Sequence, residues 1–204
     1  MEMPKVTVLL PVYNVVPYLV EAIDSLLRQT HGDFEVLAID DGSTDGSLEV
    51  LETINDSRFT LHRNEANRGL VYTLNKGLDL ASGDYIVRLD ADDIALPQRI
   101  ARHLQFMERH PDVGISGCYT RQFGDVNCDL RHSLEHEAIV AEMLFNNALS
   151  GCSPMFRRSA LRELRFSEDA PHAEDYELFA RTSAHITLAN VPEVLILRLS
   201  LIHI

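Results

Sequence analysis

Short apolar runs alternate with amphipathic segments along the first half of the chain, and this pattern constrains the fold more than any other feature. The apolar runs have the length of strands, and the segments between them carry hydrophobic residues at helical spacing. The pattern predicts strands at 6–10, 34–39, 59–62, 85–89 and 113–116, and helices at 17–30, 45–54, 69–81 and 97–109. Apolar strands separated by helices indicate an α/β fold with a parallel sheet covered on both faces.

Helix-start signals support two of these helices. Pro17 suits the first turn of the first helix, and Ser43 or Thr44 is a candidate N-cap for the second. The second half of the chain is less regular. Its residue pattern predicts a hairpin region at 119–130, a short strand at 155–156, a strand beginning at 194, and helices at 135–145 and 174–183.

The 204 residues contain no internal repeat or linker, and we expect one domain over residues 1–198. Residues 199–204 read LSLIHI, which matches a translated transposon-end adaptor used in sequencing libraries. We therefore expect a non-native tail from 199 and a catalytic domain truncated near Arg198. A genuine apolar tail is the alternative.

Composition narrows the classes of partner. The net charge of −13 argues against a nucleic-acid ligand, which needs a basic surface. It also suggests that any phosphate site recruits a metal cation. The three cysteines have no metal-site spacing and indicate reduced thiols. With no signal peptide or membrane-length apolar run visible, we expect a cytoplasmic protein, with peripheral contact to the inner face of the membrane left open.

Three predicted strands are each followed by a segment that contains polar residues, at 11–14, 40–45 and 90–93. In an open parallel sheet, ligands bind at the carboxyl ends of the strands, so these residues should meet in one cleft. That cleft would hold several carboxylates. Carboxylates packed together repel one another unless a cation or hydrogen-bond donors neutralise them.

The triplet Asp90-Ala91-Asp92 is the sharpest of these features. Two aspartates that follow a strand end and are separated by one residue can direct their carboxylates at one point. Such hard oxygen ligands suit Mg²⁺ or Mn²⁺, which often completes its shell with substrate phosphate. A solvated acidic turn is the competing interpretation of the triplet alone, but its place after an apolar strand and opposite Asp40-Asp41 favours the metal site.

Asp40-Asp41-Gly42 ends the second predicted strand, where an acid commonly accepts hydrogen bonds from a ribose. The segment also fits a turn in which Gly42 has a positive φ. Arg68 is one of few cations near the predicted cleft, and it fits either a diphosphate contact or an ordinary surface position. We expect Asn75 to tie its helix to the Asp-x-Asp loop.

Asp175 lies in the first turn of the helix predicted at 174–183. Acidic residues there interact favourably with the helix dipole, which explains them without a catalytic role. The alternative is a general base. Leu178 and Phe179 can anchor the inward face of the helix, which leaves Asp175 free to point into the cleft.

The motifs together resemble family 2 glycosyltransferases. They stand in that family's order over about residues 6–198, namely Pro11-Val12-Tyr13-Asn14, Asp40-Asp41-Gly42-Ser43-Thr44-Asp45, Asn67-Arg68-Gly69, Asn75-Lys76-Gly77, Gly83-Asp84-Tyr85-Ile86, Leu89-Asp90-Ala91-Asp92-Asp93, Met155-Phe156-Arg157-Arg158 and Glu174-Asp175-Tyr176-Glu177. The resemblance implies a GT-A fold, a three-layer α/β/α sandwich with a mostly parallel central sheet. It also implies a nucleoside-diphosphate sugar donor, a divalent metal (Mn²⁺ or Mg²⁺), and a glycan or lipid-linked acceptor.

The resemblance also implies the roles of individual residues. Asp90 and Asp92 would hold the metal, and Asp175 would be the catalytic base. The nucleotide sugar would contact a set of residues from the strand ends, namely Pro11, Tyr13, Asp40, Asp41, Arg68 and Asp90. UDP is the favoured nucleotide. Relatives continue with a Tyr-Arg-x-His-like segment after the strand that starts at 194, and this chain departs from them there.

Three other classes compete with this interpretation. A sugar nucleotidyltransferase would carry a Gly-rich phosphate loop after the first strand, where this chain has Pro11-Val12-Tyr13-Asn14. An aspartate phosphatase would carry its Asp-x-Asp there. A non-catalytic module that binds sugar nucleotides is the third alternative, and measuring sugar transfer separates it from an enzyme.

Overall fold

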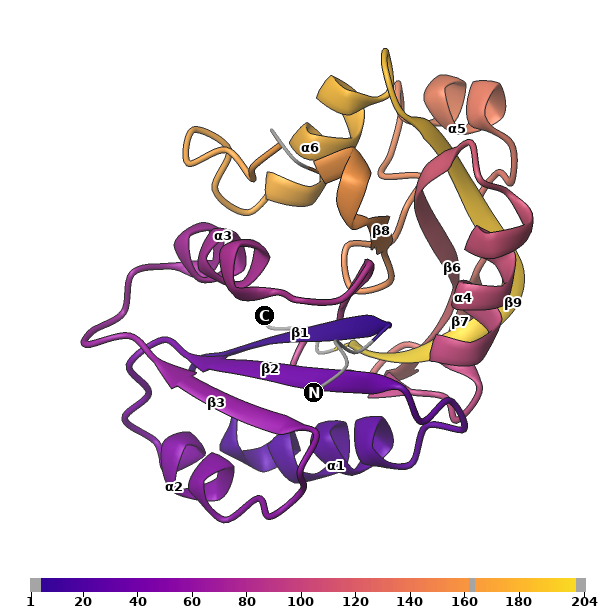
Figure 1. Cartoon of the computed structure of the whole chain (residues 1–204). Coiled ribbons are helices and arrows are strands. Elements are labelled where there is room, and N and C mark those ends of the chain that lie inside the picture. The colour runs from indigo at the N-terminus through magenta and orange to yellow at the C-terminus, as the bar shows by residue number, and fades with distance from the viewer. Residues whose placement is uncertain (1–4, 162–163, 201–204) are drawn as a thin grey trace.

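The computed structural model describes residues 5–161 and 164–200 and shows one curled sheet between two layers of helices (Figure 1). The strands lie in the order β3-β2-β1-β4-β8-β6-β9-β5, and β7 pairs with β6. Their bounds are β1 Val6–Val12, β2 Phe34–Asp40, β3 Phe59–Arg63, β4 Tyr85–Arg88, β5 Ile94–Ala95, β6 Val113–Gly124, β7 Cys128–Leu130, β8 Met155–Arg157 and β9 Thr187–Ser200.

Most strands run in one direction. Parallel pairing joins β3, β2, β1 and β4, and also β6 and β9. Strand β8 is antiparallel to both β4 and β6, so β6 and β9 share the direction of the first four strands. Strands β5 and β7 also run the other way. The mostly parallel α/β sandwich that the sequence predicts is therefore confirmed.

The helices that separate the strands form the two outer layers. Their bounds are α1 Val16–Leu27, α2 Ser47–Glu52, α3 Leu70–Leu80, α4 Arg99–Arg109, α5 His136–Glu142 and α6 Glu174–Thr182. The core on one face of the sheet takes its helical residues from α1, α2 and α4, and the core on the other face takes them from α3, α5 and α6. In β1, Val8 and Leu10 enter the first core and Leu9 enters the second, because successive strand residues point to opposite faces.

The first helices differ from their predicted bounds for local reasons. Pro17 lies in the first turn of α1, as predicted. The cap prediction for α2 is wrong, because its N-cap is Gly46 in a left-handed conformation (φ 100°). Asp45 accepts a hydrogen bond from the Ser47 backbone N–H at 2.9 Å, and Ser43 instead accepts one from the Asn14 N–H at 3.1 Å.

Asn75 also has a different partner from the one we predicted. Its side chain exchanges two hydrogen bonds with the backbone of Phe166, donating at 3.0 Å and accepting at 2.9 Å. It therefore ties α3 to the segment before α6, and it makes no such bond to the Asp-x-Asp loop.

The second half contains the predicted hairpin, in which β7 pairs with the end of β6. Strands β6 and β9 are much longer than predicted and pair from Val113 to Gly124. Leu199 and Ser200, from the segment that we expect to be non-native, continue β9, and residues 201–204 lie outside the described residues. The origin of that segment stays a prediction. Within the described residues, no helix is long and apolar enough to cross a membrane.

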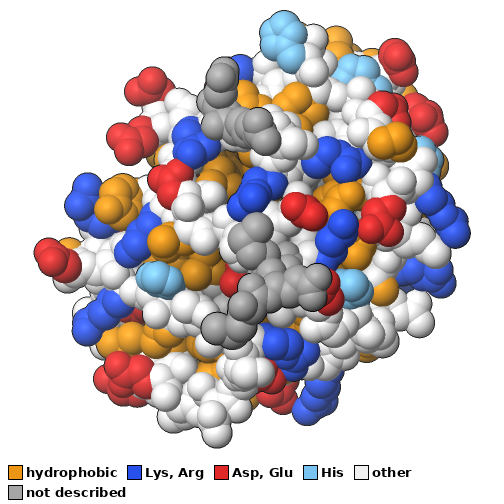
Figure 2. All heavy atoms as spheres, in the orientation of Figure 1, with side chains coloured by type: hydrophobic (Ala, Val, Ile, Leu, Met, Phe, Trp, Pro, Cys, Tyr) orange, Lys and Arg blue, Asp and Glu red, His pale blue; other side chains and the backbone are white. Residues whose placement is uncertain are grey.

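The face of the molecule drawn in Figure 2 carries charges of both signs. Figure 2 shows acidic and basic side chains interspersed over the side seen in Figure 1, outside the atoms drawn in grey. The unusual polar residues of the sequence follow the carboxyl ends of β1, β2 and β4.

Candidate active site

A cleft of about 860 Å³ lies beside the carboxyl end of β4 and the start of α6. Asp90 enters it from the loop after β4, and Asp175 enters it from the first turn of α6. The other lining residues come mainly from the loops after α5 and before α6, and include His132, Asn146, Asn147, Ser150, Gly151, His172 and Arg198. The fold thus brings together Asp90 and Asp175, which are 85 residues apart in sequence (175 − 90).

Arg88 joins the two sides of this cleft. Its Nε donates to Asp90 Oδ1 at 2.8 Å, and its Nη1 donates to Glu174 Oε1 at 3.1 Å. The Arg88 and Glu174 side chains are nearly inaccessible to solvent. Burial alone would lower the pKa of Arg88, but the charges of Asp90 and Glu174 hold it above its ordinary value. The guanidinium therefore stays charged and fixes the Asp-x-Asp loop to the helix that carries Asp175.

Arg99 supports the same loop from behind. Its side chain is fully buried, and Nη2 donates to two backbone carbonyls, those of Arg88 and, at 3.1 Å, of Cys152. Cys152 belongs to the loop that also contains Gly151. Arg99 therefore links the end of β4 to the segment that packs against Asp175.

The Asp-x-Asp loop concentrates negative charge. Burial, followed by the neighbouring charge of Asp90, raises the pKa of Asp92. The same two causes raise the pKa of Asp93 to about 7, although Asp93 Oδ1 accepts a hydrogen bond from the Leu199 backbone N–H at 2.9 Å. A cation at this loop would relieve the repulsion between these carboxylates.

The carboxylates of this loop fit a divalent metal whose coordination shell is completed by the substrate. Within the part of the chain that the structure describes, no three His, Cys, Asp or Glu side chains are grouped so as to hold a metal ion by themselves. Mg²⁺ characteristically binds one or two carboxylates together with substrate phosphates. Asp90 and Asp92 match that pattern, because they supply two carboxylates and the hydrogen bond from Arg88 to Asp90 goes to Oδ1. Asp92 itself does not line the cleft described above.

Asp175 is held in one orientation by its neighbours. The Asn147 amide donates to Oδ2 at 2.8 Å, and the Tyr176 backbone N–H donates to Oδ1 at 2.7 Å. Gly151 packs so closely that a Cβ there would overlap Oδ2. Burial is the largest influence on the pKa of Asp175 and raises it above the ordinary aspartate value. A carboxylate with a raised pKa, held at the edge of a cleft, suits proton abstraction.

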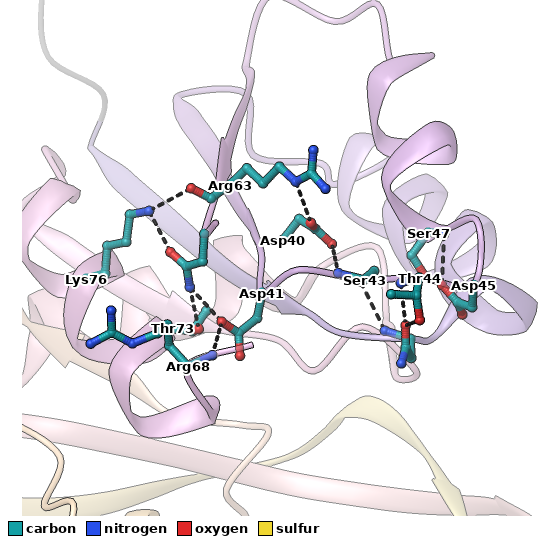
Figure 3. A network of polar contacts seen from close by, with 12 residues as sticks. Asp40, Asp41, Ser43, Thr44, Asp45, Ser47, Arg63, Arg68, Thr73 and Lys76 are labelled. Carbon is teal, nitrogen blue, oxygen red and sulfur yellow. Dashed lines mark hydrogen bonds and ion pairs between the residues drawn. The ribbon is translucent and has the colours of Figure 1, made fainter. Parts of the chain in front are cut away.

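The predicted nucleoside end contains a hydrogen-bond network centred on Asp41 (Figure 3). Asp41 Oδ1 accepts hydrogen bonds from the Asn64 amide at 2.7 Å and the Arg68 backbone N–H at 2.9 Å. Oδ2 accepts one from the Gly69 backbone N–H at 2.8 Å. The Asp41 carboxylate therefore holds the loop that leads into α3, and Gly42 beside it adopts the predicted positive φ of 75°.

Asp40 and Pro11 are buried at the ends of their strands. Asp40 Oδ1 accepts a hydrogen bond from the Ser43 N–H at 3.2 Å, and Oδ2 lies 3.6 Å from Arg63 Nε. Solvent reaches almost none of the Asp40 or Asp41 side chain. The assignment of these residues to nucleotide binding remains a prediction.

Tyr13 and Arg68 are both exposed. The Arg68 guanidinium lies over the Tyr72 ring, 4.3 Å from its centroid. Arg68 lines a cavity of about 470 Å³ that shares Leu70, His172 and Glu174 with the large cleft, so the two hollows adjoin. Arg68 thus lines a hollow that adjoins the cleft, and its diphosphate contact stays a prediction. Tyr13 lines neither hollow.

Sequence reasoning did not single out Arg88, Glu174, Asn147 or Gly151 as site residues. One signal was present for Arg88, since a charged residue within an apolar strand needs a buried partner. Glu174 could only be paired with it once the fold had brought β4 and α6 together. Asn147 and Gly151 lie in loops whose paths have no sequence signature.

The sandwich and its acidic cleft define the class of protein, a GT-A fold with the site at the carboxyl ends of the strands. The solved structures that share this fold include two in complex with a nucleotide sugar. One is Staphylococcus aureus TarS in complex with UDP-GlcNAc, which has a TM-score of 0.81 and 20% identity, and the match covers 97% of this chain and 59% of TarS. The other is the Pyrobaculum calidifontis mannosyltransferase PcManGT in complex with GDP-Man and Mn²⁺, which has a TM-score of 0.76 and 24% identity, and the match covers 97% of this chain and 57% of PcManGT.

The family model described as glycosyl transferase family 2 matches residues 7–165. An uncharacterised glycosyltransferase of Haemophilus influenzae is 35% identical over 208 residues, which cover 95% of this chain and 64% of the relative. The chain belongs to glycosyl transferase family 2, and the resemblance drawn from its motifs is confirmed. It spans a little under two thirds of the length of that relative.

Proposed function

We propose that the chain is the catalytic domain of an inverting glycosyltransferase that moves a sugar from a nucleoside-diphosphate donor to an acceptor hydroxyl. The observation that carries the proposal is the single cleft lined by Asp90 and Asp175, whose two sides Arg88 joins. Family membership and the structures of TarS with UDP-GlcNAc and of PcManGT with GDP-Man and Mn²⁺ support it. UDP is the favoured nucleotide, because TarS shares the higher structural similarity.

Each side of the cleft has one task in this mechanism. Asp90 and Asp92 would hold Mn²⁺ or Mg²⁺, which stabilises negative charge on a departing diphosphate when it is bound. Arg68 would contact the diphosphate, and Tyr13, Pro11, Asp40 and Asp41 would form the nucleoside end. Asp175 would accept the proton of the acceptor hydroxyl as its oxygen attacks the anomeric carbon. Arg88 keeps the two sides in register.

The acceptor in this proposal is a glycan or a lipid-linked sugar of bacterial-type polysaccharide or cell-envelope assembly. The reaction would take place in the cytoplasm, at the inner face of the membrane when the acceptor is lipid-linked. The free, unpaired cysteines Cys118, Cys128 and Cys152 are consistent with a reducing compartment. A non-catalytic sugar-nucleotide-binding module remains the competing function, and transfer of a sugar distinguishes the two.

Nucleotide binding is expected to depend on Mn²⁺ and on Asp92. Calorimetric titration of the chain with UDP, GDP and dTDP, with and without Mn²⁺, should show one nucleotide that binds only with the metal. The variant Asp92→Ala should lose that binding, because one of two carboxylate ligands is removed. Asp112→Ala, which removes an exposed acid between α4 and β6, is the matched control and should bind normally. Metal-independent binding that survives in Asp92→Ala would contradict the metal assignment.

Transfer is expected to invert the anomeric configuration. Asp175 is the carboxylate on the acceptor side of the cleft, and one direct displacement needs no covalent intermediate on a second carboxylate. An α-linked donor should therefore give a β-linked product. The coupling constant of the anomeric proton, measured by NMR on the first product formed, reports the configuration. A product with the configuration of the donor would rule out this mechanism.

A further inference from the structure

The segment that follows α5 exposes two large apolar side chains at the cleft. Phe145 is 87% exposed and Leu144 is 77% exposed, the highest values among the large exposed hydrophobic side chains of the described residues. Exposed apolar groups that gather at one place commonly mark a binding surface. Phe145 and Leu144 are neighbours in sequence, and both line the large cleft.

Hydrogen bonds on both sides fix this segment to the start of α6. The Tyr176 hydroxyl donates to the Met143 carbonyl at 2.6 Å, and the Asn147 amide donates to Asp175 Oδ2 at 2.8 Å. The Phe145 backbone N–H also donates to the Glu142 carbonyl at 2.9 Å. The two side chains are therefore exposed on a backbone that hydrogen bonds hold in place, and the Asn147 bond also orients the proposed base.

We propose that Phe145, with Leu144, binds the acceptor, and that the group it binds is the C–H face of an uncharged pyranose ring. This inference rests on the proposed function, because the acceptor hydroxyl must reach Asp175 to lose its proton. Phe145 and Asp175 line the same cleft, and Asn147, which bonds Asp175, lies two residues from Phe145. An acceptor sugar held against the Phe145 ring would therefore lie in the cleft that contains the base. An aromatic face offers apolar area and directional contact to such a ring.

The rest of the cleft wall suits the hydroxyl groups of the same sugar. Asn146 follows Phe145 in sequence, lines the same cleft and is exposed, and its amide can both donate and accept hydrogen bonds. Asn147 and Ser150 also line the cleft, but hydrogen bonds within the protein already engage their side chains. A pyranose has one apolar face and a rim of hydroxyls. An aromatic side chain beside uncharged polar groups therefore complements it.

A membrane surface is the alternative occupant, and the charges around α5 disfavour it. Glu135 and Glu137 are exposed at the start of α5, and the whole chain has a net charge of −13. An anionic leaflet attracts clusters of basic residues and repels acidic ones. Two apolar side chains are also a small area compared with the full apolar face of an interfacial helix.

Fluorine NMR tests which occupant Phe145 meets. All eight phenylalanines are replaced by 4-fluorophenylalanine, and the variant Phe145→Leu assigns the signal of residue 145. With UDP and Mn²⁺ present, the chain is titrated with the methyl pyranosides of glucose, galactose, mannose and N-acetylglucosamine. D-sorbitol and vesicles of neutral or anionic phospholipid are titrated in parallel. We expect the signal of Phe145 to shift with at least one pyranoside and to stay unchanged with sorbitol and with vesicles.

Ligand-observed saturation-transfer NMR then compares two variants. Phe145→Ser should weaken the affinity for the active pyranoside about fivefold, as expected for the loss of one aromatic contact. Val20→Ser, which changes an exposed apolar residue on α1, should leave the affinity unchanged. A signal that shifts with vesicles alone, or with none of the additions, overturns the inference, as does equal affinity in both variants. Calorimetry of UDP with Mn²⁺ on the wild-type chain separates the failures, because absence of UDP binding counts against the proposed function itself.

Discussion

Asp175→Asn should lower kcat for sugar transfer by about 10² to 10⁴-fold, the range that a positioned general base contributes. The amide has nearly the same shape as the carboxylate and cannot take a proton from the acceptor. The bond from the Tyr176 N–H to Oδ1 can remain, and rotation of the Asn147 amide would restore the contact at the second position. Binding of UDP with Mn²⁺ should change by less than about twofold, since the nucleotide end of the cleft is untouched.

Glu177→Gln provides the matched control on the same helix. Glu177 pairs with Arg181 at 2.6 Å, one turn further along α6, and does not line the cleft. Its removal should leave kcat unchanged and cost no more than a surface ion pair contributes, up to about 1 kcal/mol. Initial rates and nucleotide affinities of the wild type, Asp175→Asn and Glu177→Gln test whether Asp175 is the base. Wild-type rates in Asp175→Asn would show that another group accepts the proton.

The pH profile gives a second measure of the same prediction. Burial raises the pKa of Asp175, and only its deprotonated form can act as a base. Activity is therefore expected to fall as the pH decreases through that raised pKa, so the acidic limb of kcat/KM should lie above the ordinary aspartate value of about 3.9. Asn147→Ala removes a hydrogen bond to the charged carboxylate, and should move the limb to higher pH.

The sequence predicts the sheet well because its signals are local. Apolar runs of strand length and the helical spacing between them locate β1 to β4 and α1 to α4, and these elements form the two-sided core. The predicted helix bounds differ from the observed ones where a hydrogen bond determines the start of the helix. Helix α2 begins only at Ser47 because Asp45 bonds its N–H, while Ser43 bonds Asn14.

The long pairing of β6 with β9 was beyond local reasoning. Parallel partners that are far apart in sequence leave no trace in the periodicity of either strand, and the sequence predicts only the beginning of β6 and the C-terminal part of β9, from residue 194. Leu199 illustrates a further limit. Its backbone N–H bonds Asp93, a contact that any residue except proline can supply, so the side chain gives no indication of it.

The site shows the same division. Asp90 and Asp175 could be predicted because their motifs have a fixed order, and the structure places both in one cleft. The contacts that orient them could not be predicted. Arg88 bonds across 86 residues to Glu174, and Asn147 bonds across 28 residues to Asp175. Such pairs depend on the fold, which has to be known first.

Arg88→Met should destabilise the protein by about 3 to 5 kcal/mol, the cost of leaving a buried charge without its partner. Arg88 and Glu174 are each only 5% exposed, and the bond between them is 3.1 Å long. Methionine fills much of the arginine volume, but offers no donor to Glu174 or Asp90. Transfer activity should also fall, since the Asp-x-Asp loop and the helix of Asp175 lose their common contact. Urea unfolding at constant pH measures the free energy of unfolding.

Two further variants separate buried charge from loss of side-chain bulk. Arg102→Met breaks an exposed pair, in which Arg102 Nε lies 3.4 Å from Glu193 and both side chains are 45% exposed. It should cost less than about 1 kcal/mol, because exposed ion pairs contribute little. The double variant Arg88→Met/Glu174→Leu removes both buried charges and should recover most of the stability. Its activity should stay low, because Asp90 still lacks its donor. Equal stability of Arg88→Met and Arg102→Met would show that the buried bridge does not hold the two sides of the cleft together.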